Sequence, residues 1–172
     1  GNLELLYEDP GVACLDPVPI APRTAPTLLQ ETFDPDLGNE AEVVVYDVRR
    51  SHYPLPADRP IRELRVFQLL PKATHPANDP RIGHANAENA RALLGTVPVE
   101  EDGSAYFRVP ADRPLYFQVV DENGRAIQGM RSVTYFRPGE RRGCIGCHEP
   151  PNTAVPTQNV MALRREPSEL TP

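Results

Sequence analysis

Lysine, long apolar runs and a recognisable leader are scarce or absent in this sequence. Lysine occurs once, at Lys72, no basic run is present, and the formal net charge is −6. This charge balance argues against nucleic acid as a partner. No apolar run approaches the roughly 20 residues of a membrane-spanning helix, so we expect no membrane span in this chain. The chain opens at Gly1 without the basic region and apolar core of a signal peptide.

Cysteine is also scarce, and the cysteines that are present argue against two common kinds of site. Cys144 and Cys147 are three positions apart, and Cys14 lies far from them in the sequence. A zinc ribbon needs a second pair of Cys or His ligands, which the chain lacks at that spacing. A redox-active CxxC pair normally begins the helix of a βαβ unit, and no such pattern surrounds this pair. A different use of the two neighbouring thiols is therefore favoured.

The pentapeptide Cys144-Ile145-Gly146-Cys147-His148 matches covalent attachment of haem. Two thiols at this spacing can each form a thioether with one porphyrin vinyl group, and the histidine that follows is held beneath the ring as an iron ligand. We therefore expect one covalent haem c on Cys144, Cys147 and His148. Because such attachment takes place outside the cytoplasm, we expect a periplasmic or otherwise extracytoplasmic protein whose targeting segment is missing from this sequence.

Proline, by contrast, is abundant, at 21 of 172 residues, or about 12% against a usual level of about 5%. This content excludes long helices and favours short strands joined by extended loops. In residues 1–40, Pro19, Pro22 and Pro26 are spaced as in a polyproline segment. Apolar residues in the same stretch would anchor it, so we expect residues 1–40 to be extended and packed on the core rather than to form a disordered linker.

From residue 41 onward the pattern is that of short β-strands. Alternating and β-branched apolar residues predict strands at 43–48, 63–69, 93–99, 105–109 and 115–120. Asn123-Gly124 predicts a type I′ hairpin, followed by a return strand over 126–136. The sequence therefore predicts a mainly β fold, an antiparallel β-sandwich over residues 41–137.

Little helix is expected in this chain. One short helix is predicted over 86–92, ending at Gly95. The haem-attachment segment and tail, residues 138–172, follow the last predicted strand directly. The tail should be mostly extended, with one helical turn over 160–164. We expect one structural domain overall.

Four stretches of the sequence resemble a known family: GTVPVEEDGSAYF (95–107), LYFQVVDENG (115–124), QGMRSVTY (128–135) and CIGCHE (144–149). They resemble the middle domain of the hydrazine synthase alpha subunit and its planctomycete relatives. Residues 46–48 and the segment around Cys14 also look similar. The resemblance implies a β-sandwich domain that carries one c-type haem, which agrees with the strand pattern.

The resemblance also implies a second metal. In the synthase, a tyrosine four positions after the motif histidine binds the iron, and the histidine binds zinc together with an upstream cysteine. Here Asn152 stands at the position of that tyrosine, and no tyrosine follows Tyr135. Cys14 is similar in place to the upstream cysteine. We therefore expect His148 to bind iron as in ordinary c-type haems, with zinc at Cys14 as an open alternative.

The second axial position of the iron decides which function is expected, because two strong ligands favour electron transfer and an open position favours ligand binding or catalysis. The candidate distal or second-metal ligands are Cys14, His84 and Met130, and Met161 in the tail is a further thioether. Each has an ordinary alternative, namely a buried thiol, a surface or core histidine, or a core methionine. The remaining histidines are expected in a solvated loop and at a strand end, at His75 and His52.

Arg131, Arg141 and Arg142 flank the haem segment. The guanidinium group binds carboxylates in a fork geometry, so these arginines are the candidate partners of the haem propionates. Solvated loop charges are the equally simple alternative.

These observations predict an exported monohaem c-type cytochrome domain that transfers electrons within or to a larger redox protein. Its partner would be a redox protein or a neighbouring haem domain. Two alternatives stay open: a haem enzyme of the hydrazine synthase type that acts on small nitrogen compounds, and a haem module that binds or senses gases. The sequence leaves open whether the chain is an enzyme.

Overall fold

Two compact units, residues 1–31 and residues 32–172, make up the chain. The computed structural model describes residues 4–16, 18, 20–22, 32–73, 75–76, 79–84, 88–147 and 159–172. The first unit contains no helix or strand among its described residues, in keeping with its prolines. The large apolar side chains among its described residues are exposed, as is Cys14. Packing of residues 1–40 on the core stays a prediction.

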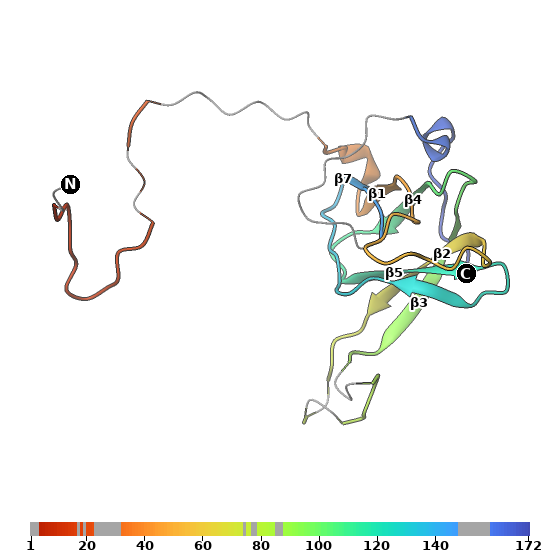
Figure 1. The fold of residues 1–172 in the computed structure, drawn as a ribbon, viewed down its shortest axis with the longest axis horizontal. Helices are drawn as coiled ribbons and strands as arrows, with labels where there is room; N and C mark the ends of the chain where they lie inside the picture. Colours follow the sequence, from red (N-terminus) through yellow and green to blue (C-terminus); the bar gives the residue numbers. More distant parts are fainter. Residues whose placement is uncertain are drawn as a thin grey trace. The chain divides into compact units, whose positions relative to one another are not determined.

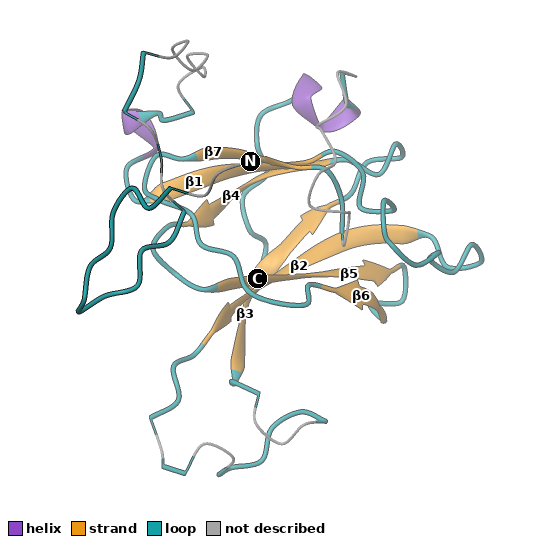
Figure 2. Ribbon diagram, turned by 60° about the vertical axis from the view of Figure 1, so that its left-hand side comes forward, coloured by secondary structure: helices purple, strands orange, loops and turns teal. Residues whose placement is uncertain are grey.

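The second unit is built from two stacked β-sheets (Figure 2). The three-stranded sheet has the order β4-β1-β7, with β4 at Ala105–Pro110, β1 at Glu40–Val45 and β7 at Arg141–Cys144. The four-stranded sheet has the order β3-β2-β5-β6, with β3 at Arg91–Pro98, β2 at Ile61–Leu69, β5 at Leu115–Asp121 and β6 at Ala126–Gly129. Two 3-10 helices are η1 (Pro35–Leu37) and η2 (Met161–Arg164). The prediction of a mainly β, sandwich-like fold is confirmed.

The hydrophobic core lies between the two sheets and is formed by alternate residues of their strands. Val43 and Val45 of β1 and Phe107 of β4 are almost fully buried, because successive side chains of a strand point to opposite faces. Phe107 and Phe117 meet edge to face with ring centroids 5.5 Å apart. Phe136 stacks on Phe117 at 6.3 Å. The aromatic residues thus join the two sheets.

Strand β7 departs from the predicted purely antiparallel sandwich. It pairs parallel with β1, with Glu42 opposite Arg141 and Val45 opposite Cys144. The residues of β7, two arginines followed by glycine and cysteine, lack the alternating apolar pattern that predicts a strand. Its pairing places the first cysteine of the motif at the end of an edge strand.

The turn between β5 and β6 also differs from the prediction. Gly124 has a φ of +70°, whereas Asn123 keeps a negative φ, so the turn is not type I′. The N–H of Gly124 donates to the carbonyl of Asp121 at 3.0 Å, and the N–H of Asp121 donates to the carbonyl of Arg125 at 3.0 Å. These bonds form a three-residue loop, which the Asp121 carboxylate favours by accepting from the N–H groups of Asn123 and Arg125. The return strand is shorter than predicted and ends at Gly129.

The long connection between β2 and β3 extends away from the two sheets (Figure 1). The helix predicted over 86–92 is wrong where the chain is described: residues 88–90 are non-helical, and Arg91 begins β3. Positions 86 and 87 lie outside the described residues. Pairing of Arg91 with Leu69 outweighs the helix propensity of this alanine-rich stretch.

The C-terminal segment returns to the sandwich and bonds to an edge strand of each sheet. The helical turn predicted over 160–164 is confirmed as η2. The N–H of Ser168 donates to the carbonyl of Tyr106 in β4 at 2.9 Å, and the carbonyl of Ser168 accepts from the N–H of Arg108 at 3.0 Å. Thr171 makes two backbone hydrogen bonds with Thr96 of β3, at 2.8 and 3.0 Å. Among the described residues, no helix is long and apolar enough to cross a membrane.

Candidate haem-attachment site

Cys144, the first cysteine of the motif, is held by the backbone of the segment that follows β1. The N–H of Tyr46 donates to the carbonyl of Cys144 at 2.9 Å, and the N–H of Asp47 donates to the carbonyl of Ile145 at 3.1 Å. The Ile145 side chain between the two cysteines is buried, with 7% exposed. The first half of the motif therefore continues the β1–β7 ladder and is anchored in the core.

Gly146 allows the motif to approach the turn at residues 47–50. A Cβ atom at this position would lie 2.5 Å from the carbonyl oxygen of Arg50 and 2.9 Å from that of Asp47. Backbone atoms cannot move aside as a flexible side chain can, so only glycine fits here without a shift of the chain. The close approach brings the loop between the two cysteines against the segment that leaves β1.

Cys147, the second cysteine, is held from β6. The side-chain amide of Gln128 donates from Nε2 to the carbonyl oxygen of Cys147 at 3.2 Å. The hydroxyl of Ser51 donates to Oε1 of the same Gln128 at 3.1 Å. Cys147 and Cys144 are both half-buried and pack against the hydrophobic core. The two cysteines thus sit on a loop that is fixed at both ends and in the middle.

The chain beyond Cys147, including His148 and Asn152, lies outside the described residues until residue 159. It returns at η2, where the N–H of Met161 donates to Oδ2 of Asp102 at 2.7 Å. The N–H of Ala162 donates to Oγ of Ser104 at 3.0 Å. The chain that follows the motif is therefore anchored at residues 161–162 by a carboxylate and a hydroxyl of the β3–β4 turn.

Asp102 is suited to this anchoring because its charged form is stabilised. Burial alone would raise its pKa. Hydrogen bonds from the N–H of Met161 and from the hydroxyl and N–H of Ser104, together with the charge of Arg49, outweigh burial and lower the pKa of Asp102. The ionised carboxylate therefore keeps its acceptors available at neutral pH.

Arg141 belongs to an ion-pair cluster next to β7. Its Nε lies 3.0 Å from Oε2 of Glu42, and its Nη2 lies 2.6 Å from Oδ2 of Asp34. The Glu42 side chain is only 4% exposed and also accepts a 2.5 Å hydrogen bond from the hydroxyl of Tyr106. Nε of Arg108 lies 3.6 Å from Oε1 of Glu42. Burial, together with the bond to Glu42 and its charge, raises the pKa of Tyr106 to about 12.

The other two candidate propionate partners are placed differently. The guanidinium of Arg142 pairs with Glu140 at 2.5 Å and lies 4.9 Å from the ring centroid of Phe136. Arg131 is exposed, and its guanidinium lies 6.0 Å from the ring centroid of Tyr53, two residues after Ser51. The structure therefore places Arg131 beside the segment that orients Gln128, whereas Arg141 and Arg142 already bind carboxylates. Propionate binding by all three stays a prediction.

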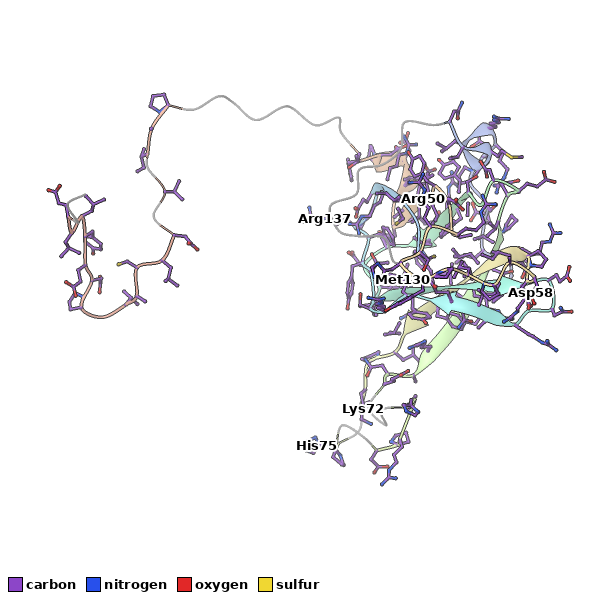
Figure 3. All side chains as sticks on the ribbon, viewed as in Figure 1. Arg50, Asp58, Lys72, His75, Met130 and Arg137 are labelled. Atoms are coloured by element: carbon purple, nitrogen blue, oxygen red, sulfur yellow. The ribbon has the colours of Figure 1, made fainter. Side chains whose placement is uncertain are left out.

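The candidate distal ligands lie in several parts of the fold. His84 and His75 are exposed on the β2–β3 connection, and Figure 3 shows His75 far out on it. This connection enters β3 at Arg91, and the Glu100–Ser104 turn lies after the other end of β3. The motif lies near that turn, because β4 begins there and pairs with Val45 of β1, which is also opposite Cys144. The structure thus does not bring His84 to the motif.

The sulfur-containing candidates are placed as follows. Met130 follows β6 and packs against the hydrophobic core. Its N–H donates to the carbonyl of Phe117 at 3.0 Å, which continues the β5–β6 ladder two residues beyond Gln128. Met161 is the first residue of η2, shortly after the described chain resumes at residue 159. Cys14 is exposed in the first unit. Ligation by any of these residues, and zinc at Cys14, stays a prediction.

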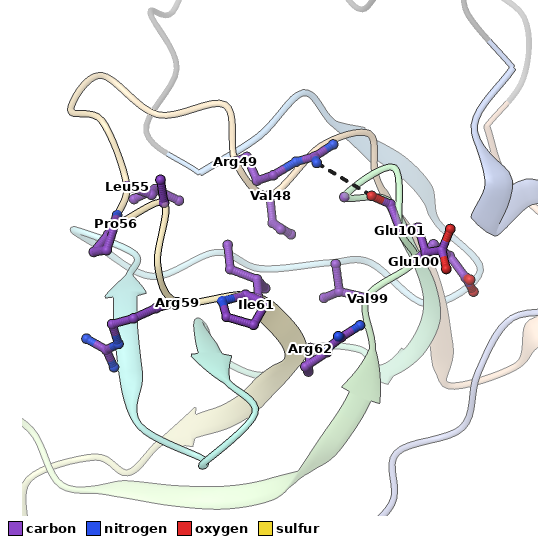
Figure 4. A pocket seen from close by; sticks show the side chains of 13 residues that line it. Val48, Arg49, Leu55, Pro56, Arg59, Ile61, Arg62, Val99, Glu100 and Glu101 are labelled. Carbon is purple, nitrogen blue, oxygen red and sulfur yellow. Dashed lines mark hydrogen bonds between the residues drawn. The ribbon is translucent and has the colours of Figure 1, made fainter.

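A hollow of about 580 Å³ lies beside the β3–β4 turn (Figure 4). Its apolar lining includes Val48, Ile61 and Val99, and charged residues, among them Arg49 and Glu101, stand at its edge. Val48 and Arg49 are neighbours of the turn residues that contact Gly146. The hollow therefore adjoins the motif through the segment that leaves β1.

The donor chemistry of the motif fits a covalent haem c. The two thiols are three residues apart, the spacing at which each can form a thioether with one porphyrin vinyl group, and both lie on a loop that packs against the hydrophobic core. Among the described residues, no group of three or more His, Cys, Asp or Glu side chains is arranged to hold a metal ion directly. A porphyrin supplies four of the iron ligands itself, so a haem needs no such protein cluster.

Gln128, Ser51, Asp102 and Ser104 support the motif but are absent from the sequence-based candidates. Each acts through a hydrogen bond to a residue more than 15 positions away in the sequence. Such polar residues give no periodic signal. The glycine inside the motif, Gly146, is the one supporting residue that carries a local sign of its role, because glycine permits close backbone approach.

Comparison with known proteins identifies the family. The family model described as the hydrazine synthase alpha subunit middle domain matches residues 60–149, which include the whole CxxCH motif and just over half of the chain. The hydrazine synthase subunit alpha of Kuenenia stuttgartiensis is 38% identical over 58 residues, 34% of this chain and 7% of that protein.

A solved structure supports the fold. Hydrazine synthase of Kuenenia stuttgartiensis superposes with a TM-score of 0.61 at 24% sequence identity, over 74% of this chain and 20% of that one. This chain therefore spans only a small part of the length of both relatives. The extent of the family match, together with the two-sheet fold, shows that the chain belongs to the hydrazine synthase alpha subunit middle domain family.

Proposed function

We propose that this chain is a haem c domain of the hydrazine synthase type, which takes part in redox chemistry of small nitrogen compounds within a larger protein. The observation that carries the proposal is that the family match extends through the CxxCH motif, whose two cysteines lie on a loop fixed to the core of the sandwich. Because this chain corresponds to a small part of its relatives, its partners would be neighbouring domains or subunits of a redox complex.

Different residues of the chain would hold different parts of the haem. Cys144 and Cys147 would hold haem by two thioethers, and His148 would bind its iron. The bound haem supplies an iron that changes oxidation state and binds small ligands. Ile145 excludes water from the inner side of the loop, and the backbone of Tyr46 keeps Cys144 in register with β1. Arg131 is the arginine of the three left to pair with a propionate.

Electron transfer without catalysis is the second candidate. The resemblance implies a tyrosine ligand at position 152, and Asn152 stands there instead. His148 together with a thioether such as that of Met161 or Met130 would hold the iron on this reading, and two strong protein ligands favour electron transfer. In both candidates the haem is attached outside the cytoplasm, so we expect an extracytoplasmic protein.

Spectroscopy of the haem-loaded chain separates the two candidates. An open sixth position, shown by high-spin ferric bands and rapid uptake of carbon monoxide by the reduced protein, is the result expected for the synthase-type function. Turnover of hydroxylamine or nitric oxide would then support catalysis. A reduced spectrum with a sharp α band that does not respond to carbon monoxide would overturn the catalytic proposal in favour of electron transfer.

A further inference from the structure

One segment of the chain, residues 165–171, pairs with an edge strand of each sheet. Ser168 forms a parallel bridge with Phe107 of β4, and Thr171 forms an antiparallel bridge with Thr96 of β3. Four backbone hydrogen bonds of 2.8–3.0 Å support the two bridges, two on each strand. The segment is therefore bound through its backbone, as an added strand is bound at the edge of a sheet.

Side chains give this binding a sequence preference. Leu170 packs against the hydrophobic core and reaches β3 at a glycine. A Cβ atom at Gly95 would lie 2.9 Å from Cβ of Leu170 and 2.8 Å from the carbonyl oxygen of Thr171. At the other end of the segment, Nε of Arg165 lies 2.7 Å from Oε1 of Glu100. The edges of β3 and β4 thus provide room for a leucine and a carboxylate for an arginine.

We infer that the edges of β3 and β4 form a binding site for an extended peptide, the β3–β4 edge site, which residues 165–171 of the same chain occupy. Addition of a strand to a sheet edge is a common mode of peptide recognition, in which the backbone gives affinity and side chains at alternate positions give specificity. The peptide that fits has the arginine and leucine of this segment at the same spacing. The site should accept the same sequence as a separate peptide when the segment of its own chain is displaced.

The test uses the full chain carrying S168P and T171P together, because proline lacks the N–H groups that bond to β4 and β3. The matched control is E169P: the N–H of Glu169 makes no hydrogen bond within the described part of the chain, and the partly exposed ion pair of its side chain with Arg108 contributes little. The probe is a synthetic peptide with the sequence of residues 165–172, labelled with fluorescein at its N-terminus. Fluorescence anisotropy measures its binding, and thermal unfolding measures the stability of each chain.

S168P/T171P should lower the thermal midpoint by about 4–8 °C, because two backbone hydrogen bonds are lost. The peptide should bind this variant saturably and raise its thermal midpoint towards that of the unchanged chain. It should not bind the unchanged chain or E169P, because in both the chain's own segment fills the site at a high effective concentration. A peptide with L170A should bind S168P/T171P about tenfold more weakly, because it buries less apolar surface.

Two results would overturn the inference: folded S168P/T171P that shows no saturable binding of the peptide, or equal affinity for the peptide with L170A. Either result would mean that residues 165–171 cover the two edges without occupying a specific site. If S168P/T171P does not fold, T171P alone, which loses one of the two N–H groups, decides by the same criteria. None of these readouts depends on haem, so the outcome is independent of the proposed function.

Discussion

The N–H of Tyr46 donates a 2.9 Å hydrogen bond to the carbonyl oxygen of Cys144. Tyr46 directly follows β1 and Cys144 ends β7, so the parallel ladder between the two strands continues into the motif. Functional groups carried on strands are held more precisely than groups on loops. The first cysteine of the motif therefore lies at the end of a rigid sheet, although the described residues after it, 145–147, have no regular secondary structure.

Replacing Gly146 by alanine should destabilise the motif. Its added methyl group would collide with the carbonyl oxygens of Arg50 and Asp47, and crowding of this kind costs about 1–3 kcal/mol of unfolding free energy. Gly143→Ala is the control, because its Cβ would meet only the edge of the Tyr46 ring, at 3.2 Å. Urea unfolding of both variants measures the difference. Equal losses would show that the close approach at Gly146 is unimportant.

Glu42→Gln should weaken the attachment of β7 to β1. The substitution keeps the size of this almost fully buried side chain but removes the charge that faces Arg141 and Arg108. Hydrogen bonds to charged groups contribute more than neutral ones, so we expect a loss of about 1–3 kcal/mol in unfolding free energy. Glu40→Gln, an exposed position on the same strand, should change it by less than about 0.5 kcal/mol. Similar effects of both would contradict the role of the cluster.

Tyr106 should make stability depend on alkaline pH. Its pKa is raised from the ordinary value of 10.0 to about 12, first by burial and then by the bond to Glu42. The folded protein thus holds this proton more tightly than the unfolded chain, so the contribution is complete below about pH 10 and is lost as the pH rises towards 12. Ultraviolet titration should show a late tyrosine step that Y106F lacks. A late step that persists in Y106F would contradict the assignment.

Asp102→Asn should make stability less sensitive to acid. Because the pKa of Asp102 is lowered in the folded state, its contribution is present above the ordinary value of 3.8 and is lost as the pH falls through the lower folded value. The variant lacks the carboxylate that accepts from Met161 and Ser104, so at pH 7 we expect a loss of about 1–2 kcal/mol.

The acid test compares urea unfolding at pH 7 with unfolding at about pH 3. D102N should lose less stability between these two pH values than the unchanged chain does. Glu101→Gln, which removes an exposed carboxylate from the same turn, serves as the control for the loss of one negative charge. A profile of D102N that runs parallel to that of the unchanged chain would contradict the role of Asp102 in anchoring residues 161–162.

Local pattern was sufficient for much of the sandwich. Strands β2, β3, β4 and β5 match predicted strands, because their apolar residues alternate or are β-branched and turn residues separate them. Strand β1, predicted over 43–48, instead begins three residues earlier, at Glu40, and ends at Val45. The type of the turn after Asp121 was not predictable from Asn123-Gly124 alone. There the buried carboxylate of Asp121 binds two backbone N–H groups and selects a different loop.

The elements that pattern missed depend on contacts between distant residues. Strand β7 forms because Arg141 makes an ion pair with Glu42 and because its backbone pairs with the edge of β1. Neither interaction can be recognised from the residues around Arg141 alone. The same holds for Gln128 at the motif and for Asp102 at η2. The chemistry of the cysteines stays a prediction from the motif, whereas the residues that support them could be recognised only in the folded chain.

The most direct test of the account is the intact mass of the chain after expression with a c-type haem maturation system. The account predicts a red protein whose mass equals that of the polypeptide plus one haem. When Cys144 and Cys147 are both replaced by alanine, the measured mass should be that of the polypeptide alone. A colourless product with the mass of the bare polypeptide would contradict it.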